Sequence, residues 1–266
     1  MGTQTDPRPI GIFDSGVGGL TVLKEIRKLL PNESIIYVGD TARVPYGSKT
    51  TKELFSYAKE IINFLLSKNV KAVVIACGTV SSTVYTQLQK EFPSLLLVDV
   101  IRPSIESCVA LAEKGLRLGL IATTATIKSN AFKHLLAEKC SGITLQARAC
   151  PLFASMVEAG LGENHPAIRF AADAYLSNLH GQIDALILGC THYPLLINTL
   201  TTILGNIEFI NIGTATALAT KKILINNMAD SHNFPTLTYY ATGTLDVFNT
   251  TGSVILGENC TPRTIC

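Results

Sequence analysis

The sequence predicts an α/β protein of two pseudo-symmetric lobes, each with a mostly parallel sheet flanked by helices, and an active site in the cleft between them. Three observations predict this fold. Short apolar runs alternate with amphipathic segments, as in βαβ units. The chain has 266 residues, which is enough for two domains of ordinary size. A similar order of elements occurs twice along the chain, which indicates an internal duplication.

The first half alternates predicted strands and helices. Its strands are predicted from short apolar runs at residues 10–13, 34–38, 72–77 and 94–98. A glycine-rich turn follows the first run and opens a helix that ends before Pro31. Thr50 and Glu53 fit a capping box, and apolar residues at helical spacing follow them. This helix leads into the strand ahead of Cys77, so the two strands around it should be parallel.

The second half repeats this pattern. Gly119 lines up with Gly11, and the distance to the next strand-end cysteine is similar in both halves, at Cys77 and at Cys190. An amphipathic helix precedes each cysteine strand. Later strands are predicted at residues 208–212 and 238–242, with a helix over 216–226 between them.

The duplication predicts where the lobes divide. The last stretch of the chain is too short for a third domain, and the simplest arrangement returns it to the first lobe. We expect the lobe that carries Cys77 to comprise residues 1–98 and 212–266, and the lobe that carries Cys190 to comprise residues 99–211.

Composition favours a small neutral or anionic ligand. The 22 basic and 20 acidic residues are interspersed and leave a net charge of +2, so there is no basic stripe for direct nucleic-acid binding. No apolar run reaches the roughly 20 residues of a membrane span. The start of the chain lacks the apolar region of a secretory signal, so we expect a cytoplasmic protein with reduced cysteines. The histidines and cysteines have no metal-ligand spacing, and no metal site is expected.

Two stretches carry the candidate chemistry. Residues 72–79 and 185–192 are both short apolar runs that end in a cysteine, Cys77 or Cys190, with a threonine close behind. Open α/β sheets bind their ligands at the carboxyl ends of the strands, so the two cysteines could face each other across one site. The alternative is that both are buried core residues, since free cysteine is often buried.

Two opposed thiols suit the transfer of a proton from one face of a carbon to the other. One cysteine acts as thiolate and the other as thiol, which requires no metal or redox change, and racemisation of an amino acid is the obvious example. Asp14 should lie near Cys77, and His192 could assist Cys190. The alternatives are that Asp14 caps the following helix and that His192 is an exposed loop residue.

Longer motifs resemble the cofactor-independent Asp/Glu racemase family, and within it the glutamate racemases of bacterial peptidoglycan synthesis. The two most specific are the stretch from Asp14 to Val22 and the stretch from Leu188 to Leu196. The other matching stretches are residues 40–47, 76–77, 125–129, 150–153 and 157–160.

The resemblance implies an isomerase without cofactor that supplies D-glutamate for the cell wall, and a homodimer. It implies that Cys77 acts on D-glutamate and Cys190 on L-glutamate, that Asp14 and His192 assist, and that Glu158 orients His192. Without the resemblance, Glu158 would be taken for a solvated residue near a helix end. The implied substrate contacts are Asp14, Ser15, Tyr46, Gly47, Gly78, Thr79, Thr123, Thr126, Thr191 and His192.

Two positions depart from the family pattern. Gly78 stands where the family has asparagine, and its lost amide would typically cost about 1.5–3 kcal/mol against a charged ligand. Arg102 stands before Pro103 where the family tends to have glutamate, which reverses a charge expected beside the cleft.

Four alternatives follow from these observations. The departures favour, as a runner-up, a weak or altered racemase acting on aspartate or another small acidic compound. A hydrolase with one Cys–His pair would leave the second cysteine unexplained. A non-catalytic member could have a binding role, as some family members inhibit DNA gyrase. The glycine-rich turn also suggests a nucleotide-binding ATPase, although it lacks the Lys-Ser/Thr of a phosphate loop.

Overall fold

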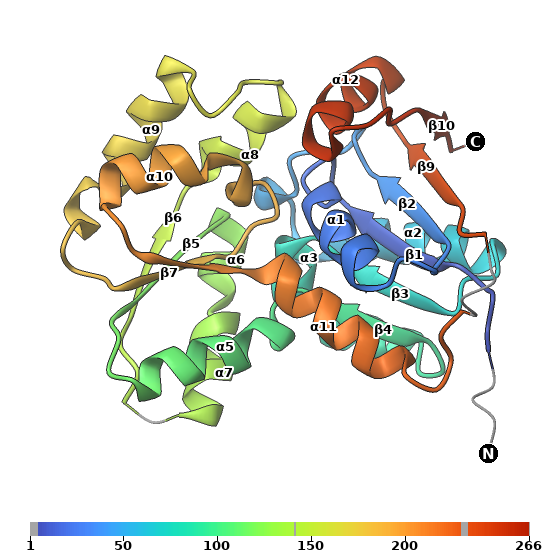
Figure 1. Cartoon of the computed structure of the whole chain (residues 1–266), viewed down its shortest axis with the longest axis horizontal. Helices are drawn as coiled ribbons and strands as arrows, with labels where there is room; N and C mark the ends of the chain where they lie inside the picture. The colour runs from blue at the N-terminus through green and yellow to red at the C-terminus, as the bar shows by residue number, and fades with distance from the viewer. Residues whose placement is uncertain (1–4, 141, 230–233, 266) are drawn as a thin grey trace.

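The computed structural model describes residues 5–140, 142–229 and 234–265. The chain forms two lobes that lie side by side, each built around one sheet (Figure 1). The strands are β1 (Ile10–Asp14), β2 (Ile35–Gly39), β3 (Ala72–Ile75), β4 (Leu96–Asp99), β5 (Leu118–Ala122), β6 (Leu145–Ala149), β7 (Ala185–Leu188), β8 (Glu208–Asn211), β9 (Leu237–Ala241) and β10 (Pro262–Thr264).

Helices connect these strands. The α-helices are α1 (Leu20–Leu29), α2 (Thr51–Ser67), α3 (Gly78–Thr83), α4 (Tyr85–Glu91), α5 (Arg102–Glu113), α6 (Thr124–Ser129), α7 (Ala131–Lys139), α8 (Pro151–Glu158), α9 (Pro166–Leu176), α10 (Ile197–Leu204), α11 (Ile212–Leu224) and α12 (Leu245–Leu256). Short 3₁₀ helices are η1 (Tyr46–Ser48), η2 (Ser177–Leu179) and η3 (Tyr193–Leu196).

The two sheets have matching strand orders. The first is β10-β9-β2-β1-β3-β4 and the second is β6-β5-β7-β8, and the strands pair in parallel throughout the described residues. In each sheet the first strand of the lobe lies between the second and the third, so that β1 corresponds to β5 and β3 to β7. The predicted duplication and the predicted α/β class are therefore confirmed, and the sheets are wholly rather than mostly parallel. In the first sheet, β9 and β10 add to the edge beyond β2.

Alternation along the strands sends apolar side chains to both faces of each sheet. In the first sheet one face packs against α1, α11 and α12, and the opposite face packs against α2, α3 and α4. In the second sheet α8, α9 and α10 cover one face, and α5 and α7 cover the other. The core beneath α1 and α11 continues beneath α5 and α7, so one apolar core reaches into both lobes.

Local signals placed several elements correctly. Thr50 and Glu53 make both hydrogen bonds of the predicted capping box at the start of α2. Strands β3 and β7 end two residues before their cysteines, slightly earlier than predicted. The helix predicted from residue 216 begins at Ile212, because the Asn211 side chain accepts a hydrogen bond from the Gly213 N–H and caps it.

The strands β6 and β10 were not predicted. The side chains of β6, Leu-Gln-Ala-Arg-Ala, are all half-buried at the edge of the second sheet, so the strand lacks an apolar run. β10 has only three residues and lies at the edge of the first sheet, next to β9. Within the described part of the chain, no helix is long and apolar enough to cross a membrane.

Candidate active site

A cavity of about 360 Å³ opens between the carboxyl ends of the two sheets. It lies where β1 meets β3 and β5 meets β7, the point at which strand order reverses in each sheet and where α/β proteins bind ligands. Its volume suits a small molecule. The lining residues are Asp14, Ser15, Val44, Pro45, Tyr46, Gly47, Ser48, Lys49, Cys77, Gly78, Thr79, Thr123, Thr124, Ala125, Lys128, Pro151, Ala154, Cys190, Thr191 and His192.

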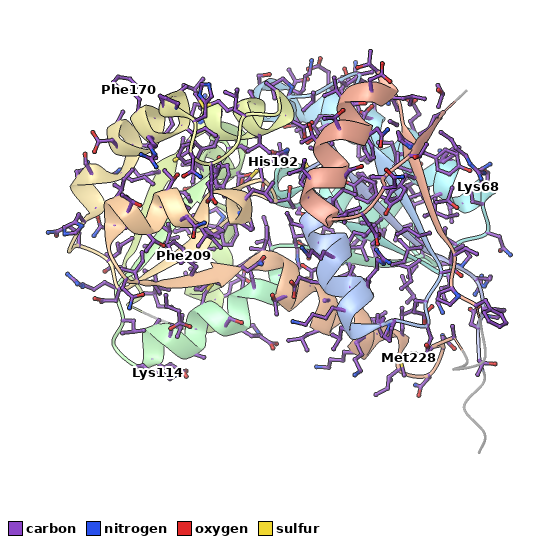
Figure 2. All side chains as sticks on the ribbon, turned by 45° about the horizontal axis from the view of Figure 1, so that its top comes forward. Lys68, Lys114, Phe170, His192, Phe209 and Met228 are labelled. Atoms are coloured by element: carbon purple, nitrogen blue, oxygen red, sulfur yellow. The ribbon has the colours of Figure 1, made fainter. Side chains whose placement is uncertain are left out.

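Both cysteines line this cavity from corresponding positions in the two lobes. Cys77 follows β3 and Cys190 follows β7, and the two side chains are 4% and 5% exposed. In Figure 2, His192 beside them lies where the two lobes meet, well away from Phe170 and Lys68 at the outer ends of the molecule. The prediction that both cysteines serve one site therefore agrees with the geometry.

Cys190 lies in a hydrogen-bonded row with His192 and Glu158. The Cys190 Sγ is 3.5 Å from His192 Nδ1, and His192 Nε2 is 2.6 Å from Glu158 Oε1. Burial disfavours the imidazolium, but the hydrogen bond and charge of Cys190, followed by those of Glu158, outweigh it and raise the pKa of His192 well above its ordinary value. A protonated His192 can donate to both neighbours, and it provides a partner for a thiolate at Cys190.

Cys77 has a different environment. Burial and the nearby Asp14 carboxylate raise the pKa of the Cys77 thiol well above its ordinary value, while the backbone N–H groups of Val80 and Thr79 oppose this rise by hydrogen bonding. The protein without substrate therefore favours a thiol at Cys77. The two sulfurs therefore lie in different environments, with Asp14 near Cys77 and the His192 ring beside Cys190.

Asp14 is buried at the end of β1 and joins the two lobes. Its Oδ1 accepts a hydrogen bond from the Ser15 N–H at 2.7 Å, and its Oδ2 accepts one from the Thr191 hydroxyl at 2.9 Å. The alternative in which Asp14 caps the next helix is wrong, because α1 begins at Leu20 and has no side-chain cap. His192 is likewise buried and is no exposed loop residue.

The glycine-rich turn is shaped to receive the His192–Glu158 pair. A Cβ on Gly16 would lie 2.0 Å from Glu158 Oε1, and a Cβ on Gly18 would lie 2.4 Å from the His192 ring. The N–H of Val17 also donates to Glu158 Oε1 at 2.8 Å. Side chains of the second lobe thus fill the turn where a phosphate loop would bind its phosphate, which argues against the ATPase alternative.

A chain of hydroxyl groups crosses between the lobes. The Thr79 and Thr123 hydroxyls are 2.9 Å apart, and the Thr123 hydroxyl donates to the Thr126 hydroxyl at 3.0 Å. Ser82 also donates to Thr126, at 3.2 Å. Thr126 is not among the lining residues, and its buried hydroxyl is hydrogen-bonded to Thr123, so its contact with substrate stays a prediction.

The loop from Val44 to Lys49 forms another wall. The Tyr46 ring lines the cavity, and its hydroxyl donates to the buried Asp40 carboxylate, which also accepts a hydrogen bond from Arg43. The Tyr46 hydroxyl is therefore already engaged by Asp40. Burial, followed by the charge of Asp40, raises the pKa of Tyr46 far above its ordinary value, so the phenol stays protonated.

Eleven of the predicted site residues line the cavity, and Glu158 and Thr126 support lining residues from behind. The prediction missed two cations, Lys49 from the first lobe and Lys128 from the second. Both lie in or next to the quoted motifs, at residues 40–47 and 125–129, and this adjacency was the available signal.

The departure at Arg102 does not face the cavity. Its guanidinium pairs with Asp99 at 3.2 Å and stacks over the Tyr85 ring at 4.1 Å from the ring centroid. The expectation of a reversed charge beside the cleft is therefore wrong for the described conformation. Among residues 5–140, 142–229 and 234–265, no group of three or more His, Cys, Asp or Glu side chains is arranged to hold a metal ion.

Comparison with known proteins decides the family. A family model described as Asp/Glu/hydantoin racemase matches residues 10–220, which include both cysteines. The chain belongs to the Asp/Glu/hydantoin racemase family. The resemblance predicted from the motifs is therefore confirmed.

Relatives in this racemase family match along nearly the whole chain. The glutamate racemase of Aquifex aeolicus (strain VF5) is 40% identical over 254 residues, 96% of each chain. The crystal structure of a glutamate racemase from Bacillus anthracis has a TM-score of 0.91, with 35% identity and 97% of each chain covered. The glutamate racemase of Francisella tularensis, solved in complex with D-glutamate, has a TM-score of 0.88, with 34% identity and 98% of each chain covered.

Proposed function

We propose that this protein is a cofactor-independent isomerase that interconverts L- and D-glutamate and supplies D-glutamate for peptidoglycan synthesis. The observation that carries the proposal is that Cys77 and Cys190, at corresponding positions of two duplicated lobes, line one cavity. A single nucleophile or a single base would need only one of them. Two thiols approaching a carbon from opposite sides are what an inversion by proton transfer requires.

The two thiols account for both proton transfers of the reaction. From L-glutamate, a thiolate at Cys190 takes the α-proton and becomes a thiol, and the bonding electron pair stays on the substrate as a carbanion. The Cys77 thiol then gives its proton to the opposite face of the same carbon and becomes a thiolate. From D-glutamate the roles are reversed, and Cys77 is the base.

The surrounding groups prepare each sulfur for its role. His192, protonated and held by Glu158, stabilises negative charge on Cys190. Asp14 lies near Cys77 and favours its protonated form, and its charge also suits a hydrogen bond from the substrate ammonium group. A thiol at Cys77 and a cationic partner beside Cys190 are what the reaction from L-glutamate needs.

The remaining lining residues would hold the two carboxylates of the substrate. Several threonines line the cavity, and Lys49 and Lys128 add positive charge at its wall. We assign the substrate contacts to Asp14, Ser15, Tyr46, Gly47, Gly78, Thr79, Thr123, Thr191 and His192, with Thr126 acting through Thr123.

The runner-up is racemisation of aspartate or another small acidic compound. Gly78 favours it, because the wall there lacks the side-chain amide of the family pattern. A Cys–His hydrolase would use Cys190 and His192, but it leaves Cys77 without a role. A binding role without catalysis, such as gyrase inhibition, would not require either thiol.

Exchange of the α-proton in D₂O tests the reaction and the substrate together. The protein is incubated separately with L-glutamate and L-aspartate, and loss of the α-proton signal is followed by NMR. We expect exchange and racemisation of glutamate to exceed those of aspartate. Absence of exchange with glutamate at high protein concentration would refute the proposal, and faster exchange with aspartate would favour the runner-up.

Three further properties remain predictions. We propose that residues 1–98 with 212–266 and residues 99–211 act as two units that enclose the substrate. We propose a cytoplasmic location, where peptidoglycan precursors are made and thiols stay reduced. A homodimer is expected from the family, and light scattering after size exclusion would measure it.

A further inference from the structure

Backbone segments of the two lobes lie close together next to the two cysteines. Gly78 directly follows Cys77, and Gly189 directly precedes Cys190. A Cβ built on Gly78 would lie 2.6 Å from the Gly189 carbonyl oxygen, 3.6 Å from its carbonyl carbon and 3.9 Å from the Cys190 Cα. Real Cβ atoms do not come within 3.0 Å of such an atom, so a side chain at position 78 does not fit this arrangement.

Backbone hydrogen bonds hold both segments, the one at Gly78 and the one at Gly189, to their own sheets. The Gly189 N–H donates to the Ile121 carbonyl at 2.8 Å, which fixes it against β5. On the other side, the N–H of Ala76 donates to the Phe13 carbonyl at 2.8 Å and fixes the residue before Cys77 against β1. Relief of a clash would therefore shift a strand end together with its cysteine.

We propose that Gly78 is a positioning residue that sets the separation of the two thiols by allowing α3 to contact the backbone at Gly189. This inference rests on the proposed two-thiol reaction. Glycine matters here through the absence of a Cβ and not through an unusual backbone angle. An ordinary contact of 3.4 Å in place of 2.6 Å would require a movement of about 0.8 Å between the segments that carry Cys77 and Cys190.

A movement of this size is large for proton transfer. Reacting atoms must approach to about 3–3.5 Å, and a misplacement of 1 Å can cost about 100-fold in rate. The loss should fall on kcat, because both thiols must reach one carbon in the transition state. KM should change less, since most of the lining residues of each lobe stay in place relative to their own sheet.

The close contact between Gly78 and Gly189 also bears on the departure from the family pattern at position 78. Asparagine at position 78 would restore an amide to the wall, but its Cβ would meet Gly189 at the same 2.6 Å. In this structure the Gly189 carbonyl oxygen lies in the space that a side chain at position 78 would occupy. The variant Gly78→Asn should therefore lose activity, whereas a simple loss of substrate contacts would predict that it gains activity.

The test compares Gly78→Ala and Gly78→Asn with the unmodified protein and with Gly162→Ala, a matched control whose Cβ would have nothing within 4 Å. We measure kcat and KM in both directions, the kinetic isotope effect with α-deuterated glutamate, and thermal unfolding. We expect both Gly78 variants to lose about 100-fold in kcat with a larger isotope effect, and Gly162→Ala to be unchanged. A Gly78→Ala variant that keeps kcat, or a Gly78→Asn variant that raises it, would overturn the inference.

A crystal structure of the unmodified protein with bound D-glutamate supplies a readout that does not depend on the variants folding. The inference requires that a Cβ built on Gly78 still lies under 3.0 Å from the Gly189 oxygen, and a distance of 3.4 Å or more would contradict it. Failure of the proposed function has a different signature, because the unmodified protein would then show no racemisation of glutamate. Loss of the Gly78 inference leaves racemisation by the unmodified protein intact.

Discussion

Replacing Glu158 with glutamine keeps the size of the side chain and removes the charge that faces His192. Glu158 Oε1 is 2.6 Å from His192 Nε2 and accepts the Val17 N–H at 2.8 Å, and both partners are buried with it. A hydrogen bond to a buried charged group contributes about 1.5–3 kcal/mol. We therefore expect kcat/KM to fall about 10- to 150-fold in Glu158→Gln.

The loss should be equal in the two directions. L- and D-glutamate have the same free energy, so the ratio of the two kcat/KM values is fixed at one whatever the variant. The separate kcat values are free to differ, and we expect the larger effect where Cys190 removes the proton, because His192 stabilises that thiolate. Racemisation is followed by circular dichroism from each enantiomer.

The pKa of His192 gives this variant a second readout. The pKa of His192 is higher in the folded protein than in the unfolded chain, where it is about 6.5. Protonated His192 therefore adds its full contribution to folding stability below about pH 6.5, and this contribution is lost as the pH rises through the folded pKa. Removal of the Glu158 charge lowers the folded pKa, and the loss of thermal stability should begin at a lower pH. Melting curves between about pH 6 and pH 9 measure this.

A matched control separates the role of Glu158 from a general effect of losing a carboxylate. Glu163 accepts hydrogen bonds from Asn198 outside the cavity, and Glu163→Gln makes the same chemical change. It should keep wild-type kcat/KM and the same pH dependence. If Glu158→Gln also keeps both, then the charge of Glu158 does not support His192 in the reaction.

Four further variants test other parts of the site and fold. Cys77→Ser and Cys190→Ser should each abolish racemisation, because a serine hydroxyl is a far weaker acid than a thiol, as measured by polarimetry. Lys49→Gln with Lys128→Gln should lower kcat/KM several-fold at low ionic strength and leave kcat nearly unchanged, with a weaker salt dependence. Lys71→Met should lower the free energy of unfolding by about 3–5 kcal/mol, as measured with denaturant. The Lys71 ammonium is 2.6 Å from the Glu33 carboxylate, and the substitution leaves this buried carboxylate without its ion-pair partner.

Each of these variants has its own comparison. Racemisation by either serine variant at a measurable rate would exclude the two-thiol reaction. Lys114 lies at the outer edge of the molecule (Figure 2), and an equal effect of Lys114→Gln would show that net charge, not the cavity wall, matters. The Lys59–Glu91 pair is exposed, so Lys59→Met should leave the unfolding midpoint nearly unchanged. Equal costs for Lys59→Met and Lys71→Met would contradict the assignment of a buried ion pair.

The parts of the site at strand ends could be predicted from sequence. Cys77 and Cys190 follow apolar runs, and a parallel sheet brings the carboxyl ends of its strands to one rim, which also places Asp14. The capping box of Thr50 and Glu53 could also be predicted, because its two residues are three positions apart in the sequence.

The parts of the site that depend on contact between the lobes could not be predicted from local sequence patterns. Glu158 meets Val17 across 141 residues of chain, and no local pattern reports that contact. The glycine-rich turn has several possible uses as a sequence, and only the fold shows that Gly16 makes room for Glu158. The resemblance assigned Thr126 to the substrate, but the packing behind Thr123 is a property of the assembled site.

The apolar core that runs beneath α11 and α5 joins the two sheets although the lobes descend from one repeated pattern. Two lobes that arose by duplication could be expected to fold independently. Here the side chains of Ile105 and Ala217 belong to the same buried cluster, and separating the lobes would expose that cluster to water. Melting should therefore be cooperative across the whole molecule, and neither half expressed by itself would be expected to reach a native state.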